Sequence, residues 1–206
     1  MTTQLSFDPA RSALLSMDYQ AGIVSIYAKD QEDLLARASS VLKGARDSGM
    51  TIVHVQVGFR PGLPEVSPRN LLLGAIKSSE QHQRLFQGAA SAIHEAVAPE
   101  GDDIVVTKHR VNAFTGTDLE MILRAKEVDT LALFGIATGG VVLSTLLHAA
   151  DADYRLIVIK DCCADLDAEV HSCLVNKLFP RQATVVSARD FLDALSISSG
   201  VNGDEG

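Results

Sequence analysis

The stretch that decides the fold runs Thr130-Leu131-Ala132-Leu133-Phe134-Gly135-Ile136-Ala137-Thr138-Gly139-Gly140-Val141. Its first five residues form a short apolar run, which is typical of a buried strand. A glycine-rich turn follows from Gly135 to Gly140, and from about Val141 to Ala152 the apolar residues recur at helical spacing. The stretch therefore predicts a strand, a turn and a helix in succession.

Similar units lie on both sides of this stretch. Five other short runs are apolar or β-branched, and we expect them to form the strands Ser12–Met17, Thr51–Val57, Asp103–Thr107, Leu156–Ile159 and Thr184–Val186. We expect helices through Leu34–Ala45 and over about 117–126 and 167–178, a partly helical segment at 81–97, and a short helix near the C-terminus. The glycines and prolines of Gly58–Pro68 predict a long loop, which is a candidate lid.

Alternating strands and helices imply parallel strands joined by right-handed crossovers, with helices on both faces of the sheet. The predicted class is a three-layer α/β/α sandwich of the Rossmann-like type. In such sheets ligands bind beyond the carboxyl ends of the strands, where the strand order reverses. Polar residues at that edge are therefore the candidate functional residues.

Composition narrows the class of protein further. The chain has 206 residues, 47% of them hydrophobic, which suits one domain with a single core. Its net charge of −8 argues against a nucleic-acid partner, because phosphate contacts need clustered positive charge. No apolar run is long enough to span a membrane, and the polar N-terminus lacks the pattern of a signal peptide, so we expect a cytoplasmic protein. Three cysteines give no disulfide framework or recognisable metal motif, and we expect reduced thiols.

Two charged residues follow predicted strands at the candidate edge. Asp18 comes after the first strand and Lys108 after the third, while the turn Gly135–Gly140 follows the fourth. A carboxylate and an ammonium at the mouth of an apolar cleft can tune each other's pKa, and backbone N–H groups at a helix start can bind a developing oxyanion. These are parts of a hydrolytic site, but an ordinary ion pair over a glycine-rich turn would have the same spacing.

Three separated motifs in the right order carry a resemblance to a known family. They are Leu15-Ser16-Met17-Asp18-Tyr19-Gln20, Val106-Thr107-Lys108-His109-Arg110-Val111-Asn112-Ala113-Phe114, and Leu133-Phe134-Gly135-Ile136-Ala137-Thr138 with the following helix. Together they resemble the isochorismatase-like (cysteine hydrolase) family over about Ser12–Leu195. The resemblance implies a six-stranded parallel sheet in the order 3-2-1-4-5-6 and an isochorismatase-like hydrolase domain over residues 1–198. Residues 199–206 are themselves predicted to form a flexible tail.

The resemblance also implies where the catalytic residues lie, and one of them departs from the family pattern. Members typically use an Asp, a Lys and a Cys, and the first two match Asp18 and Lys108. The position of the cysteine is occupied by Val141, which has neither a lone pair nor a proton to exchange, so covalent thiol catalysis is excluded there. Cys162 and Cys163 follow the fifth predicted strand, and we interpret both as structural, with thiol hydrolysis through either as a further alternative.

Isochorismatases proper hydrolyse a vinyl ether without a thiol. By analogy, Asp18 would be the general acid, while Lys108 would position a substrate carboxylate or stabilise developing charge. Burial raises the pKa of such an aspartate and a nearby lysine lowers it, and the sequence does not decide between them. Family members commonly have a non-proline cis peptide after the fourth strand, and here the matching bond is Ile136–Ala137. We expect substrate to contact Gln20, Phe114, Ile136, Ala137 and Gly140.

Other candidate residues have a structural interpretation beside the functional one. Related nicotinamidases carry an Asp-x-His metal site after the second strand, but residues 56–61 hold no acid or imidazole, so we predict no metal and no cofactor. His54 is predicted to be a core histidine. Arg60 and Arg110 are interpreted as solvated or structural arginines, with binding of a substrate carboxylate as the alternative, and His109 and His171 are interpreted in the same way.

These observations lead to one principal hypothesis. We expect a hydrolase that acts on a small carboxylate-bearing substrate, at a vinyl ether or a related C–O or C–N bond, by Asp18 acid/base chemistry without a thiol. The alternative is a ligand-binding family member that has lost catalysis. The expected partners are a small-molecule substrate and further copies of the chain, as a homodimer or homotetramer, with no nucleic acid and no membrane.

Overall fold

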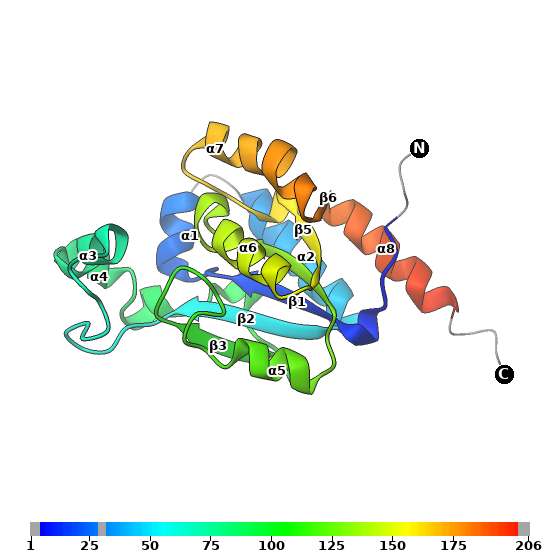
Figure 1. The fold of residues 1–206 in the computed structure, drawn as a ribbon, viewed down its shortest axis with the longest axis horizontal. Coiled ribbons are helices and arrows are strands. Elements are labelled where there is room, and N and C mark those ends of the chain that lie inside the picture. The colour runs from blue at the N-terminus through cyan, green and yellow to red at the C-terminus, as the bar shows by residue number, and fades with distance from the viewer. Residues whose placement is uncertain (1–4, 29–31, 202–206) are drawn as a thin grey trace.

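The computed structural model describes residues 5–28 and 32–201. Its centre is a six-stranded, all-parallel sheet in the order β3-β2-β1-β4-β5-β6, which confirms the predicted fold class (Figure 1). The strands are β1 (Ser12–Met17), β2 (Thr51–Val57), β3 (Ile104–Lys108), β4 (Thr130–Gly135), β5 (Arg155–Ile159) and β6 (Thr184–Val186).

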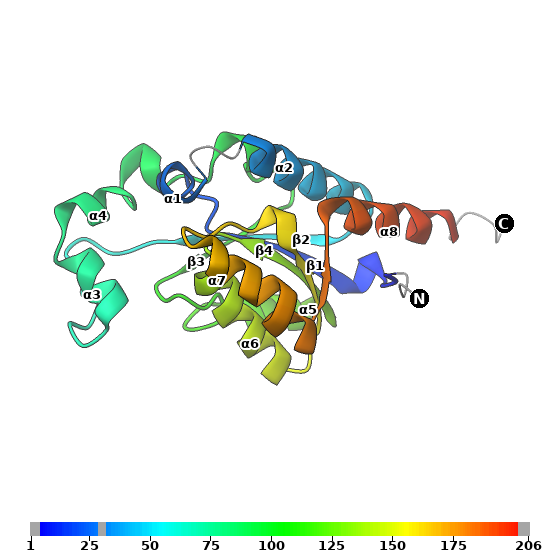
Figure 2. The same cartoon turned by 90° about the horizontal axis from the view of Figure 1, so that it is seen from above.

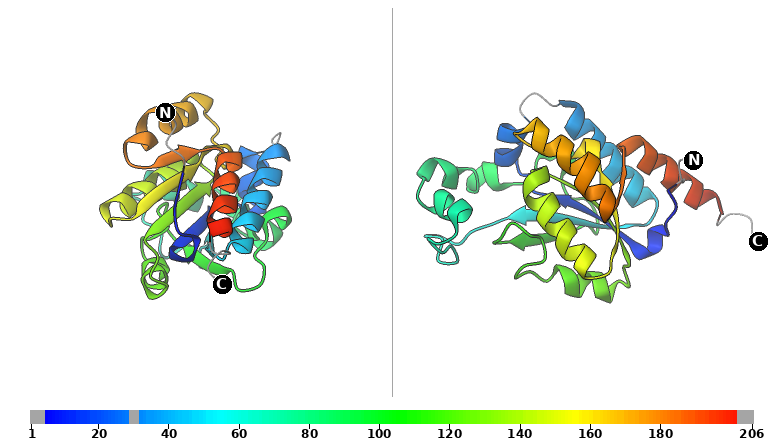
Figure 3. Two further views of the ribbon diagram at one scale, coloured as in Figure 1. Left: turned by 90° about the vertical axis from the view of Figure 1, so that its right-hand side faces the viewer. Right: turned by 45° about the horizontal axis from the view of Figure 1, so that its top comes forward.

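Helices cover both faces of the sheet. They are α1 (Ala21–Tyr27), α2 (Glu32–Asp47), α3 (Leu71–Lys77), α4 (Glu80–Arg84), α5 (Leu119–Ala125), α6 (Leu143–Asp151), α7 (Ala168–Cys173) and α8 (Ala188–Val201). Helices α1, α2 and α8 lie on one face, and α5, α6 and α7 lie on the other (Figure 2). The same two layers are visible along the sheet in Figure 3.

Short 3-10 and π-helical segments complete the chain. These are η1 (Pro9–Arg11), η2 (Gly88–Ser91), η3 (Glu95–Val97), η4 (Thr138–Val142), η5 (Lys160–Cys162), η6 (Leu174–Leu178) and η7 (Phe179–Arg181). Two of them, η4 and η6, are single π-helical turns that adjoin α6 and α7 respectively. The segment η4 begins at Thr138, so the last three residues of the predicted glycine-rich turn are already helical.

The central strands are buried on both faces, and this explains their sequence. Every residue of β1 and of β4 is buried, including Ser12, Ser16 and Thr130. A strand covered on both faces has a nearly continuous apolar run, because neither set of alternating side chains faces water. The strand order reverses between β1 and β4, so the carboxyl ends of these two strands mark the place where this fold class binds ligands.

An arm built from α3 and α4 projects from the carboxyl edge of the sheet, away from the main body (Figures 1 and 2). A small apolar cluster holds it together: Leu63, Val66 and Leu73 are buried, with Phe59 and Ile76 packed against them. The sequence predicted only a partly helical segment at 81–97, and α3 was not predicted. Over 81–97 the chain has the end of α4 and the two 3-10 segments η2 and η3, so this part of the prediction holds in outline.

The C-terminal helix is longer than expected. Helix α8 extends to Val201 and therefore includes the first residues of the predicted tail, whereas residues 202–206 lie outside the described residues. Among the helices that the structure describes, none has the length and apolar character to cross a membrane.

Candidate active site

Asp18 and Lys108 meet at the carboxyl edge of the sheet, although β2 lies between the strands that carry them. Asp18 directly follows β1, where its N–H donates to the Val55 carbonyl at 2.8 Å. Lys108 is the last residue of β3, and its Nζ lies 2.9 Å from Asp18 Oδ2. The side chain of Lys108 is 1% exposed and that of Asp18 is 7% exposed, so the ion pair is almost completely removed from water.

The backbone at Asp18 has an unusual conformation. Its φ of +59° lies in the left-handed region, which L-residues other than glycine adopt rarely and aspartate more readily than most. Because the chain turns sharply at the end of β1, the carboxyl group lies at the base of a cavity instead of continuing the strand. Strained backbone of this kind is common at ligand sites.

The polar atoms of the pair are unequally satisfied. Lys108 Nζ also donates to the Arg110 carbonyl at 3.0 Å. By contrast, Asp18 Oδ1 is buried and has no hydrogen-bond partner among the described residues. Burial raises the pKa of Asp18, and the neighbouring Lys108 lowers it by a smaller amount, so the net shift is upward. The effect of burial on the pKa of Asp18 is thus larger than the opposing effect of Lys108, a question that the sequence did not decide.

The end of β4 forms a second side of the site. The peptide bond Ile136–Ala137 is cis, which confirms the prediction, and the Ile136 N–H donates to the Met17 carbonyl at 3.1 Å. A Cβ on Gly135 would lie 2.8 Å from that carbonyl and 3.3 Å from Val141 Cγ1, so only glycine permits this close approach. The contact brings the turn after β4 against the end of β1, next to Asp18.

Three residues that follow β5, Ala164, Asp165 and His171, hold this turn in place. The Thr138 N–H donates to the Ala164 carbonyl at 2.9 Å, and the Thr138 hydroxyl shares a hydrogen bond of 2.8 Å with His171 Nδ1. Asp165 Oδ2 accepts from the Gly139 N–H at 2.7 Å. The structure therefore supports the structural interpretation of His171, and it adds Thr138 and Asp165 as positioning residues that the sequence analysis did not single out.

A cavity of about 360 Å³ opens above these groups. Six of the predicted site residues line it: Asp18, Lys108, Ile136, Ala137, Gly140 and Val141. Most of the remaining wall is apolar and comes from α1, from the arm, and from the segments next to β2, β3 and α7. The sequence analysis did not identify the arm residues of this wall.

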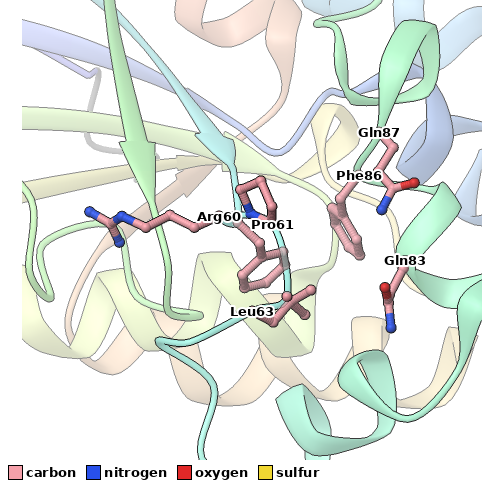
Figure 4. A pocket seen from close by; sticks show the side chains of 8 residues that line it. Arg60, Pro61, Leu63, Gln83, Phe86 and Gln87 are labelled. Atoms are coloured by element: carbon pink, nitrogen blue, oxygen red, sulfur yellow. The ribbon is translucent and has the colours of Figure 1, made fainter.

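A neighbouring cavity of about 250 Å³ lies at the base of the arm (Figure 4). The labelled side chains come from the loop after β2 and from the segment that begins in α4, namely Arg60, Pro61, Leu63, Gln83, Phe86 and Gln87. Phe59 and Phe86 line both cavities, and their rings meet edge to face with centroids 5.4 Å apart. None of the predicted catalytic residues lines this second cavity, so we assign the site to the first.

Two predicted substrate contacts do not line the cavity. Gln20 is fully buried, and its amide Nε2 donates to the Val57 and Ser91 carbonyls at 2.9 and 2.8 Å, while its Oε1 accepts from the Val57 N–H at 2.7 Å. Both ends of the amide are therefore occupied in joining β2 to η2. Phe114 is 6% exposed and stacks on the His148 ring at a centroid distance of 4.5 Å, which places it in the core beside α6.

The cysteines after β5 have the properties of structural residues. Cys162 and Cys163 are both buried, and neither lines the cavity. Burial raises the pKa of the Cys162 thiol, and it raises that of Cys163 to about 12. Thiols with such raised pKa values carry almost no thiolate at neutral pH, which argues against the alternative of hydrolysis through either residue.

The remaining charged candidates occupy different environments. His54 is a core histidine, as predicted, with Nε2 3.1 Å from Asp103 Oδ2, and burial lowers its pKa. The side chain of Arg60 is 64% exposed, in agreement with a solvated arginine. Arg110 lines the cavity. Across residues 5–28 and 32–201, no group of three or more His, Cys, Asp or Glu side chains has the arrangement of a metal site.

Taken together, the doubly wound sheet and the cavity at its switch point define an α/β protein with a candidate ligand site. Residues 12–190 match the Isochorismatase domain, and the chain belongs to the isochorismatase family. The maleamate amidohydrolase of Pseudomonas putida is 26% identical over 195 residues, covering 92% of this chain and 89% of that protein.

Two further comparisons agree with this assignment. The ureidoacrylate amidohydrolase of Methylorubrum extorquens is 30% identical over 176 residues, covering 76% of this chain and 71% of that protein. A solved isochorismatase family protein from Burkholderia thailandensis aligns with a TM-score of 0.79 and 26% identity, covering 94% of this chain and 100% of that chain. By relationship, the protein is therefore classed as a hydrolase.

Proposed function

We propose that the protein hydrolyses a small carboxylate-bearing substrate without a thiol nucleophile, and that Asp18 acts as the general acid. One observation supports this most strongly: the Asp18 carboxyl is buried at the base of the cavity, and its Oδ1 has no hydrogen-bond partner among the described residues. A free oxygen atom that lines a cavity can exchange a proton with a bound substrate. The raised pKa of Asp18 favours the protonated form that a general acid needs.

The residue at the start of the helix after β4 is the reason to propose a thiol-independent reaction. Val141 is 2% exposed and lines the cavity. By the family resemblance it occupies the position of the nucleophilic cysteine, and its isopropyl group can neither attack a carbonyl nor bind a proton. An amide route like those named for the maleamate and ureidoacrylate relatives would need another nucleophile, and water is the simplest.

A vinyl ether is the bond that this constellation suits best. Asp18 gives its proton to the terminal carbon of the enol ether, whose π electrons form the new C–H bond and leave an oxocarbenium ion. Water adds to this cation and loses a proton to the Asp18 carboxylate, and the hemiketal then collapses to a ketone and an alcohol. Lys108, 2.9 Å away, stabilises the negative charge on Asp18 while the proton is on the substrate.

The turn after β4 supplies the surface that holds the reacting group. Ile136, Ala137 and Gly140 line the cavity beside Val141. We propose that these three residues orient the substrate against Asp18.

The second candidate function is ligand binding without turnover, and Val141 is the observation that favours it. A family member that has lost its nucleophile can retain the cavity and the ion pair as a binding site. For either function we further propose that the protein works in the cytoplasm as a homodimer or homotetramer. Light scattering after size-exclusion chromatography would measure the mass of the assembly and so distinguish a dimer from a tetramer.

A hydrolysis screen separates the two functions. The panel contains isochorismate, simpler vinyl ethers, primary amides and N-carbamoyl compounds, each assayed with wild type, Asp18→Asn and the exposed control Asp118→Asn. Our proposal expects turnover of a vinyl ether that survives thiol alkylation, is unchanged in Asp118→Asn, and falls by about 10²–10⁴-fold in Asp18→Asn. Full activity of Asp18→Asn would refute it, and saturable binding with no turnover across the panel would favour the binding function.

A further inference from the structure

The charges in the cavity wall are few, and most of them are already engaged. Asp18 and Lys108 pair with each other, and Lys108 uses a second N–H on the Arg110 carbonyl. Among the described residues, the other ionisable side chains of the wall are the Arg110 guanidinium, the exposed His82 imidazole on α4, and the Tyr27 phenol on α1, whose pKa is raised by burial. Arg110 is therefore the permanent cation that remains for an anionic group of a ligand.

Arg110 is held so that donors remain for a ligand. Its Nη1 donates to the His109 carbonyl at 2.6 Å and its Nη2 donates to the Glu65 carbonyl at 3.0 Å. A guanidinium has five N–H donors in a rigid planar fork, so two hydrogen bonds leave three donors while fixing the plane. Such an arginine binds a carboxylate with defined geometry.

Most of the rest of the wall is hydrocarbon. Its apolar side chains come from α1, from the end of β2 and the loop after it, from the arm, and from the segments after β3 and before α7; Ile23, Phe59, Leu72, Ile76, Phe86 and Leu166 are among them. A second carboxylate placed against these apolar side chains would lose its hydration without gaining a partner, which is strongly unfavourable. Each methylene buried there instead strengthens binding about fourfold.

We infer that the cavity selects substrates with a hydrocarbon body, either a ring or a branched chain, and a single carboxylate, which Arg110 binds. This inference rests on the proposed function, because it names the substrate class of the same site. It assigns to Arg110 the specificity role that the sequence left as an alternative. It also predicts that dicarboxylates of similar size bind poorly.

Two adjacent leucines on α3 provide an internal comparison. Leu72 lines the cavity although it is 59% exposed, so a bound ligand would cover apolar surface that now faces water. Leu71 is 90% exposed and does not line the cavity. A change at Leu72 should therefore weaken binding of a bulky ligand, while the same change at Leu71 should not.

Isothermal titration calorimetry with non-reacting probes tests the inference without requiring turnover. The probes are benzoate, cyclohexanecarboxylate, the neutral isostere benzamide, and succinate. We expect at least one ring carboxylate to bind tenfold or more tightly than benzamide and succinate. Arg110→Gln should weaken its binding about tenfold or more while leaving the affinity for benzamide unchanged, whereas Arg110→Lys should restore part of it.

Matched variants complete the test. Arg60→Gln removes the same charge from an exposed side chain outside this cavity and should leave all affinities unchanged. Leu72→Ser should weaken binding of cyclohexanecarboxylate about threefold, and Leu71→Ser should not. Unchanged benzamide affinity in the Arg110→Gln, Arg60→Gln and Leu71→Ser variants shows that the cavity is intact.

Three results would overturn the inference: succinate binding as tightly as the ring acids, ring-acid binding that is unaffected by Arg110→Gln, or no measurable binding of either ring acid. These outcomes are separable from those of the proposed function. Selective binding of ring acids by a protein without hydrolytic activity would refute the proposed reaction and leave the ligand class standing. Turnover of a polar dicarboxylate would refute the ligand class and leave the proposed reaction standing.

Discussion

Replacing Lys108 with methionine tests the energetics of the buried pair. Lys108 Nζ lies 2.9 Å from Asp18 Oδ2, and both side chains are buried. At this distance and an effective dielectric constant of about 20, two unit charges attract each other by about 6 kcal/mol, which opposes the cost of desolvating both ions. Removal of one partner from such a pair costs about 3–5 kcal/mol of stability, because the other charge is left buried.

The loss of stability in Lys108→Met should depend on pH. Burial raises the pKa of Asp18 and Lys108 lowers it, so the variant raises this pKa further. A carboxyl whose pKa is higher in the folded than in the unfolded state binds a proton on folding, so its contribution to stability declines as the pH rises from about 4 to the folded-state pKa. We expect a deficit of about 3–5 kcal/mol at pH 8 that shrinks at pH 5, by up to about 1.4 kcal/mol per pH unit.

Urea denaturation followed by circular dichroism at pH 5 and pH 8 measures this deficit. The control is the double variant Asp18→Asn/Lys108→Met, which removes both charges and should recover part of the stability at pH 8. Equal deficits at the two pH values would refute the reasoning, as would a double variant that is no more stable at pH 8 than Lys108→Met alone.

Three further predictions follow from other parts of the structure. Val141→Cys is expected to create hydrolysis of primary amides that iodoacetamide abolishes, and no gain over wild type would mean that the turn no longer supports a thiolate. Arg46→Gln breaks a 2.6 Å ion pair with Asp103 and should cost about 2 kcal/mol in urea denaturation at neutral pH. Burial alone would raise the pKa of Asp103, but its hydrogen bonds, of which that from Arg46 is the largest, hold this pKa below its usual value. The stabilisation by the ion pair is therefore lost once acid protonates Asp103, and the free energies of unfolding of wild type and Arg46→Gln should become equal below about pH 4. Gly22→Ala would place a Cβ 2.5 Å from the Leu85 carbonyl and should lower the Tm by several degrees, and an unchanged Tm would contradict the close packing of α1 on this segment.

The strands could be predicted from the sequence because burial on both faces leaves a clear pattern. The observed bounds of β1 match the prediction, and those of β4 differ by one residue at one end. The arm could not be predicted in the same way, because α3 and α4 have only seven and five residues, and neither shows helical periodicity: nearly every residue of α3 is apolar, and every residue of α4 is polar. Their available signals were the capping residues Asn70 and Ser79, whose side chains accept from the N–H groups of Leu73 and His82.

The site was predictable where it depends on strand ends and uncertain where it depends on side-chain direction. Asp18 and Lys108 follow from the register of a parallel sheet, which brings the carboxyl ends of β1 and β3 to one edge. Gln20 is only two residues past Asp18, but backbone groups of β2 and η2 satisfy its amide, and this pairing is visible only in three dimensions. The upward pKa shift of Asp18 likewise depends on burial that residue spacing does not encode.

The pH dependence of kcat/KM for wild type and Asp18→Asn, on the substrate that the screen identifies, tests the central claim most directly. The account predicts that wild-type kcat/KM declines as the pH rises through the raised pKa of Asp18, and that Asp18→Asn loses about 10²–10⁴-fold together with this titration. An Asp18→Asn protein that keeps both the rate and the pH profile of wild type would contradict it.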